Sequence, residues 1–80
     1  MNKFEIIQFL SDFLKQEVLA NGVQFTEKTP FSSLGMDSYS IINMLIALEE
    51  KSGKSIIENG IRTEHIISIE TLTEFVLTRN

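Results

Sequence analysis

Apolar residues recur every three or four positions in three stretches of the chain, which predicts three amphipathic helices. The first helix begins at Asn2, where Glu5 completes a capping box, and it ends near Asn21–Gly22. The second helix covers residues 38–51. The apolar face of the first helix consists of Ile6, Ile7, Leu10, Phe13, Leu14 and Val18.

The third helix extends from Ile69 to about Arg79, with Ser68 as its N-terminal cap and Leu72, Phe75 and Val76 toward the core. A short helical turn at 64–66 precedes it, with Thr63 as the expected cap. The chain has no strand signal. We therefore expect an all-α fold, a small four-helix bundle of three principal helices and one short helix.

Two connections interrupt the helical periodicity. Between the first two helices, the four apolar residues Val23, Phe25, Phe31 and Leu34 are expected to hold an ordered loop against the core. Such a long loop either serves function or only closes over the core, and both interpretations stay open. After the second helix, Gly53 is expected to adopt a left-handed cap, Ile56 and Ile57 to point inward, and Asn59–Gly60 to form a turn.

The second helix carries apolar residues on two separate faces. On a helical wheel, Ile41, Leu45 and Leu48, with Met44 at the margin, form the face expected in the core. Tyr39, Ile42 and Ile46 form a second face, which we call the outer facet. We expect Ile42 and Ile46 to be partly exposed and available to partner proteins; a wider core contact is the alternative.

Candidate chemistry lies at the start of this helix. Gly35 permits a sharp turn, Asp37 or Ser38 can cap the first turn, and Ser38 then lies at the helix N-terminus. Unpaired amides and the helix dipole favour a phosphate at this position. An ordinary helix start gives the same local pattern, and Asp37 then serves only as a cap.

Length and composition narrow the function. The 80 residues form one domain, 1–80, and a chain of this size has little room for a deep catalytic cleft. A net charge of −4 disfavours nucleic acid and favours partners with basic surfaces. No apolar run is long enough to span a membrane, and the start does not resemble a secretory signal, so a cytoplasmic protein without membrane insertion is expected. We also expect a monomer.

The run Leu34-Gly35-Met36-Asp37-Ser38 resembles the modification site of acyl carrier proteins, Leu-Gly-x-Asp-Ser before an amphipathic helix. The resemblance extends to the chain length, the preceding helix and loop, and the closing Ser-Ile-x-x-Leu-x-x-Phe-Val segment. It implies that Ser38 carries 4′-phosphopantetheine from coenzyme A, with Asp37 and Gly35 as neighbouring site residues. The chain has no cysteine, so the sulfur of any thioester would come from that attached group.

The resemblance implies a non-catalytic carrier with no metal of its own, modified by a phosphopantetheinyl transferase and visited by acyl-loading and acyl-processing enzymes. Asp37 would also help position the metal that the transferase uses. The expected partner-recognition residues are Tyr39, Ile42, Asn43, Ile46, Glu49 and Glu50. Because Glu49 and Glu50 point in different directions on a helix, they are interpreted as solvated charges and not as an acid–base pair.

The sequence departs from fatty-acid carriers in ways that leave the pathway open. Ser40 and Asn43 stand where acidic residues are usual, and Tyr39 replaces the usual leucine. We therefore expect a stand-alone carrier for polyketide or other specialised synthesis more than for housekeeping fatty-acid synthesis. An aminoacyl or peptidyl carrier, an unmodified helical interaction module and, more remotely, a small hydrolase are the alternatives. His65 has no partner residues for catalysis or metal binding in the sequence and is expected at the surface.

Overall fold

The computed structural model describes residues 1–18 and 22–78, and every regular element in these ranges is helical. Three α-helices, α1 (Lys3–Phe13), α2 (Ser38–Ser52) and α3 (Ile69–Thr78), form the body of the domain. Short helical segments join them: a π-helical turn at Leu14–Val18 and 3-10 helices at Phe31–Leu34, Ile57–Asn59 and Thr63–His65. The predicted all-α class and the three principal helices are confirmed.

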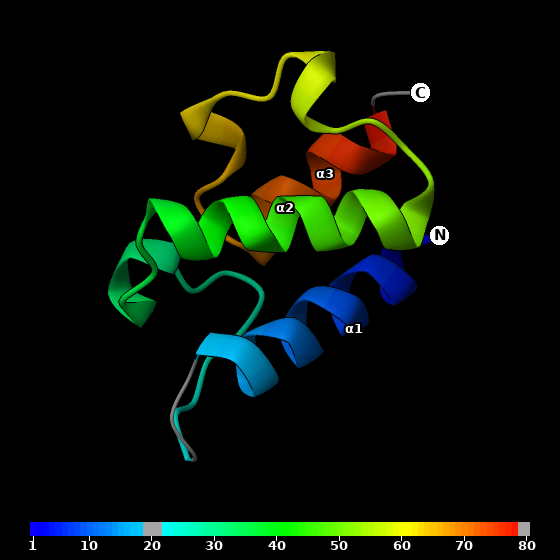
Figure 1. Ribbon diagram of the computed structural model, residues 1–80. Helices are drawn as coiled ribbons and strands as arrows, with labels where there is room; N and C mark the ends of the chain where they lie inside the picture. Colours follow the sequence, from blue (N-terminus) through cyan, green and yellow to red (C-terminus); the bar gives the residue numbers. More distant parts are fainter. Residues whose placement is uncertain (19–21, 79–80) are drawn as a thin grey trace.

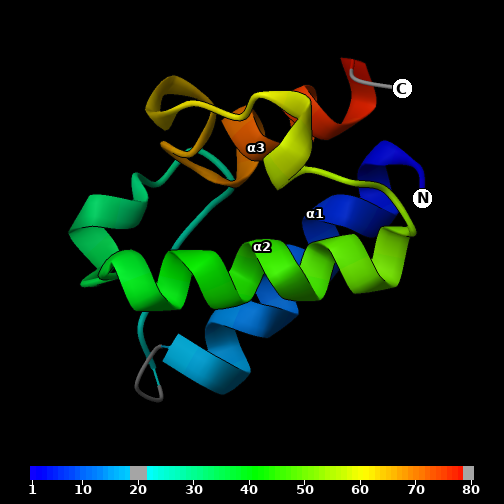
Figure 2. The same ribbon diagram turned by 45° about the horizontal axis from the view of Figure 1, so that its top comes forward.

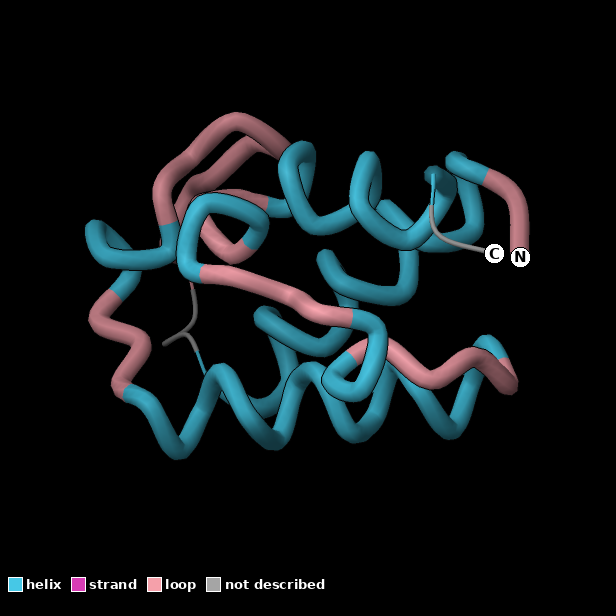
Figure 3. The backbone as a smooth tube through the Cα atoms, turned by 90° about the horizontal axis from the view of Figure 1, so that it is seen from above, coloured by secondary structure: helices cyan, strands magenta, loops and turns pink. Residues whose placement is uncertain are grey.

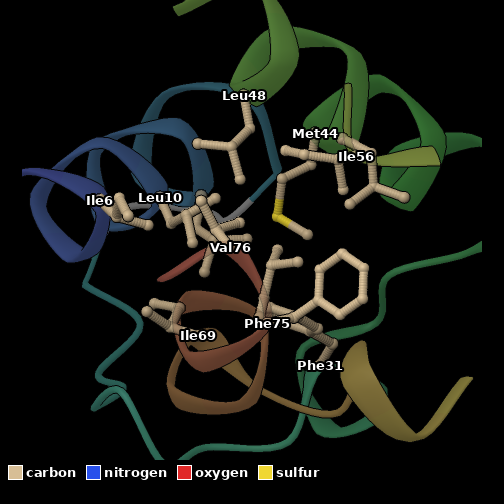
Figure 4. Packing of buried hydrophobic residues seen from close by; sticks show 12 residues of the cluster. Ile6, Leu10, Phe31, Met44, Leu48, Ile56, Ile69, Phe75 and Val76 are labelled. Atoms are coloured by element: carbon tan, nitrogen blue, oxygen red, sulfur yellow. The ribbon is translucent and has the colours of Figure 1, made fainter. Parts of the chain in front are cut away.

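The three helices surround one apolar core. Helix α1 crosses α2 obliquely, and α3 lies behind α2 in Figure 1 and packs against α1. The start of α1 and the end of α3 lie at the same end of the molecule, and α2 begins at the opposite end (Figures 1 and 2). Figure 4 shows side chains from all three helices meeting between them, with Phe31 and Ile56 added from the connections. The site at the start of α2 therefore lies far from the chain's first residue.

Both predicted caps on α1 and α3 are present. The Glu5 amide donates to Asn2 Oδ1 at 2.8 Å, and the Asn2 amide donates to Glu5 Oε1 at 2.9 Å. At α3, the Thr71 amide donates to Ser68 Oγ at 3.3 Å, and the Ser68 amide donates to Thr71 Oγ1 at 3.0 Å. These bonds satisfy the amides of the cap residue and of the first turn, which have no carbonyl of a preceding turn to bond. The predicted helix ends near Asn21 and Arg79 fall outside the described residues.

Two backbone hydrogen bonds hold the long connection between α1 and α2 against the start of α3. The Phe31 amide donates to the Ile67 carbonyl at 2.7 Å, and the Glu70 amide donates to the Glu27 carbonyl at 2.8 Å. These two bonds tie the connection to the segment that begins α3. Figure 3, seen from above, shows the connections as loops between the helical segments. Phe31 is buried as expected, but Val23 is exposed, so the prediction that Val23 anchors the loop is wrong.

The segment after α2 differs from expectation in two details. Ile56 is buried but Ile57 is exposed, because the 3-10 helix at 57–59 turns its first side chain toward solvent. The short helix predicted at 64–66 is a 3-10 turn at Thr63–His65, which Arg62 precedes, and Thr63 is not its cap. The Arg62 amide instead donates to His65 Nδ1 at 2.9 Å. The fourth helix of the expected bundle is therefore a single turn.

Candidate functional site

The chain reverses direction immediately before α2. Phe31 is fixed in the core, and the 3-10 helix that it begins ends at Gly35, whose φ of 74° and ψ of 19° lie in the left-handed region. A side chain would be strained there by its backbone angles alone, since a Cβ added at Gly35 would meet no atom within 4 Å. Gly35 therefore contributes to the site by directing the chain into α2.

Asp37, one of the two residues predicted to cap the first turn, is the N-cap of α2. Its Oδ1 accepts a hydrogen bond from the Ser40 amide at 2.8 Å, and its backbone carbonyl accepts the first helical bond, from the Ile41 amide at 3.1 Å. The bond from the Ser40 amide, helped by the Ser40 side chain, lowers the pKa of the Asp37 carboxyl below its ordinary value. Asp37 is thus an anion at neutral pH that faces into the first turn.

Ser38 is the first residue of the 15-residue helix α2, and its side chain is exposed. The amides at the start of a helix have no carbonyl of a preceding turn to bond, and the helix dipole is positive at this end. A phosphate ester on the Ser38 oxygen would meet open solvent on one side and this positive helix end on the other. The arrangement fits a phosphopantetheine group, although the anionic Asp37 lies next to it and offsets part of the attraction.

The outer facet lies beside Ser38 and is exposed. Tyr39, Ile42 and Ile46 have exposed fractions of 74%, 50% and 42%. The expectation that Ile42 and Ile46 are partly exposed is confirmed, and the wider core contact is excluded. On the opposite face, Met44 is completely buried, whereas Ile41 is only half-buried. The prediction had placed Ile41 in the core and Met44 at its margin, so the depth of burial of these two residues is the reverse of what was expected.

A groove on the α1 side of the outer facet was not predicted from the sequence. It has a volume of about 500 Å³ and lies between the end of α1 with its π-helical turn and the polar flank of α2. Phe13, Glu17 and Val18 line it on one side, and Tyr39, Asn43 and Glu50 on the other. The α2 residues were predicted for partner recognition. The α1 residues were missed, since an α-helical wheel for residues 3–21 gives no sign of the π turn.

The two glutamates at the end of α2 have different roles. Glu49 Oε2 accepts hydrogen bonds from the Ile56 and Ile57 amides at 2.6 and 2.9 Å, so this half-buried carboxylate holds the segment after α2. The interpretation of Glu49 as a solvated charge is wrong, because the chain folds back over it. Glu50 is exposed, as expected.

His65 is half-buried and not a plain surface residue. Its ring lies 4.6 Å from the ring of Phe75 between centroids, and its Nδ1 accepts the Arg62 amide bond. Within residues 1–18 and 22–78, no group of three His, Cys, Asp or Glu side chains is placed to hold a metal ion. His65 therefore serves the turn before α3.

Comparison with known proteins gives one informative similarity. The chain is 33% identical over 75 residues to a protein of Arabidopsis thaliana named acyl carrier protein 4, chloroplastic. The match covers 92% of this chain and 53% of that protein, so the chain spans about half the length of the relative. No protein-family model and no solved structure matches. In the described part of the chain, no helix combines the length and apolarity needed to cross a membrane.

Proposed function

We propose that this chain, which is acyl carrier protein-like in its sequence and in its all-α fold, carries 4′-phosphopantetheine on Ser38 and shuttles thioester-bound acyl groups between enzymes. The observation that supports this most directly is the exposed Ser38 hydroxyl at the start of α2, beside the capping Asp37. The same start carries the Leu-Gly-x-Asp-Ser motif. Bound there, the arm supplies the thiol that the cysteine-free chain lacks.

Attachment is a phosphoryl-type transfer from coenzyme A. The Ser38 oxygen forms a bond to the phosphorus of the phosphopantetheine unit. The bond between that phosphorus and the bridging oxygen of the coenzyme A pyrophosphate breaks. Adenosine 3′,5′-bisphosphate leaves, and a base of the transferase takes the hydroxyl proton. The exposure of Ser38 gives the transferase access to this oxygen.

Asp37 and Gly35 act by positioning. Gly35 turns the chain so that α2 begins at an exposed point, and Asp37 holds the first turn through the Ser40 amide. One Asp37 oxygen is bound to that amide, and we propose that the other helps to orient the divalent metal that the transferase brings. The chain is thus a substrate of the transferase, and we propose that it has no catalytic activity of its own.

Partner enzymes are proposed to read the outer facet and the polar residues beside it. Tyr39, Ile42 and Ile46 offer exposed apolar area next to the arm, and Asn43 and Glu50 offer polar contacts. Glu49 was in the predicted set, but its bonds to the Ile56 and Ile57 amides hold it in place, so its contribution to binding is through the shape of this end of α2. The net charge of −4 favours basic partner surfaces.

The cargo is proposed to belong to polyketide or other specialised synthesis, including aminoacyl or peptidyl transfer, more than to fatty-acid synthesis. Ser40 and Asn43 give the polar flank near Ser38 less negative charge than basic fatty-acid enzymes would favour. We propose that the carrier works as a cytoplasmic monomer. Efficient elongation of its cargo by purified fatty-acid synthase enzymes would contradict the specialised pathway.

The test is modification in vitro. Purified protein is incubated with coenzyme A and a promiscuous phosphopantetheinyl transferase, and its intact mass is measured. The proposal requires a gain of one phosphopantetheine on the wild type and on Ser40→Ala, and no gain on Ser38→Ala. Circular dichroism of the three proteins should be the same, which excludes misfolding as the cause of any loss.

The exposed outer facet also supports a second function, an unmodified module whose facet binds a partner helix. The same experiment separates the two, because that module gains no mass with coenzyme A and transferase. Thioesterase activity from the unmodified chain would favour a hydrolase over both.

A further inference from the structure

We propose that the groove between the π-helical turn and α2 receives the end of the arm and selects a cargo that carries a positive charge, such as an aminoacyl group. This inference rests on the proposed function, since it needs an arm on Ser38. It names the substrate class that the first proposal leaves open. Three observations support it: the position of the groove, its charge and the turn that builds it.

The groove begins beside the attachment point and has the length of the arm. Tyr39 and Ser40, the two residues that follow Ser38, line it, and its α2 side extends to Glu50. That side covers about 16 Å at 1.5 Å per residue. A phosphodiester followed by two amide-linked segments has about the reach of five extended residues, roughly 17 Å. A group on the terminal thiol therefore reaches the far end of the groove, where Glu50 lies.

The residues that line the groove suit a ligand with a cationic group on a short apolar stem. Phe13, Val18 and Ile46 supply apolar contacts for methylene groups. Glu17 comes from one side and Glu50 from the other, and no Lys, Arg or His is among the described lining residues. A fatty acyl chain in this groove would place apolar atoms against carboxylates and dehydrate them at a cost, whereas an ammonium group is attracted by the negative charge of the lining.

The π-helical turn is what brings Glu17 to the groove. Seven residues make nearly two α-helical turns, so a continued α-helix would place Glu17 on the same face as the fully buried Leu10. The wider turn at Leu14–Val18 changes this register, and Glu17 is exposed and lines the groove. Val18 meanwhile packs against the core. The irregular turn thus removes a carboxylate from the interior and places it on the wall of the groove.

The experiment compares two cargos of the same length. The transferase attaches stable arms from synthetic coenzyme A analogues ending in 4-aminobutyryl or pentanoyl amides, which differ only in ammonium against methyl. Intact mass first confirms loading on Ser38, and amide chemical shifts of Val18, Asn43 and Ala47 then report groove occupancy. Exposed ion pairs of about 0.2–1 kcal/mol predict an occupancy about 1.4- to fivefold higher for the ammonium cargo. Salt at about 1 M, where the screening length is near 3 Å, should remove the difference.

The double variant Glu17→Gln, Glu50→Gln should also remove the difference, whereas Glu58→Gln, an exposed carboxylate outside the groove, should keep it. Loading of Ser38 with equal shifts for both cargos overturns the groove inference alone. A preference that persists in the double variant overturns it as well. Failure to load Ser38 overturns the proposed function and this inference together.

Discussion

The two apolar faces of α2 have similar side chains and opposite environments. Met44 and Leu48, on the inner face, are fully buried, whereas Ile42 and Ile46, on the outer facet, are 50% and 42% exposed. Helices α1 and α3 and the residues Phe31 and Ile56 cover the first face. The second face begins one residue from Ser38.

This contrast shows that apolar periodicity alone does not specify a core. A small bundle can surround a helix on one side only, so the second apolar face stays in contact with water. Exposed apolar area of this kind is a common mark of a binding surface. Here it lies beside the residue proposed to carry the arm. We therefore assign stability to the inner face and propose recognition for the outer facet.

The largest expected effect is on the inner face. Leu48→Ala should lower the free energy of unfolding by about 2–5 kcal/mol, because it leaves a cavity in a fully buried site. Ile46→Ala should lower it by less than about 1 kcal/mol, because the side chain is already half in water. Urea unfolding of both variants measures the difference. A similar loss for the two would break the distinction between the faces.

The next effect distinguishes the two glutamates at the end of α2. Glu49→Ala should lower the free energy of unfolding by about 1–3 kcal/mol, because the Ile56 and Ile57 amides lose their acceptor. Glu50→Ala is the matched control and should change it by less than about 0.5 kcal/mol. If Glu50→Ala were the more damaging change, the assigned roles would be reversed.

Gly35→Ala tests the turn that presents Ser38. The left-handed backbone at this residue should make the variant less stable by about 1–2 kcal/mol, with no steric clash to add to the strain. Chemical denaturation measures the loss, and Gly35→Asn, which tolerates this conformation better, should lose less. Equal stability of wild type and Gly35→Ala would show that the turn is not required in this form.

On the outer facet the expected effect is on transfer and not on stability. Ile42→Ala should reduce the rate of arm transfer or cargo loading about fivefold, the effect of losing roughly 1 kcal/mol of binding, while its unfolding midpoint stays close to the wild type. Kinetics of modification at limiting carrier concentration provide the measurement. Normal kinetics together with a large loss of stability would place Ile42 functionally with the core.

The smallest expected effect is the pH dependence from Asp37. Its pKa is lowered in the folded state, so its stabilising contribution is present above the ordinary value of 3.8 and is lost as the pH falls through the folded pKa. Asp37→Asn keeps a capping oxygen without the charge. The wild type should therefore be the more stable protein above pH 3.8 and lose this advantage below it, as followed by thermal unfolding. An advantage that grows on acidification would contradict the assignment.

The sequence predicted the parts of the fold that local rules determine. The caps at Asn2, Asp37 and Ser68 and the left-handed Gly53 depend on neighbours within a few residues, and all are present. The outer facet was also predicted, because three apolar residues fell outside the core stripe. Local patterns of this kind located the candidate site itself.

The errors concern contacts between distant segments. Glu49 was assigned to solvent because the return of Ile56 and Ile57 over α2 cannot be read from helical spacing. Val23 and Ile57 were assigned inward because they are apolar, but both are exposed, and Ile57 begins a 3-10 turn that helical spacing does not predict. The π turn, and with it the groove, depends on how the end of α1 packs.

The central claim is that the Ser38 oxygen carries the arm, and peptide-level mass spectrometry of the protein from its native host tests it most directly. Fragmentation should place one phosphopantetheine, with or without cargo, on Ser38 and leave Ser32, Ser33 and Ser40 unmodified. A bare Ser38 in cells that contain the transferase, or an arm on one of the other serines, would contradict the account.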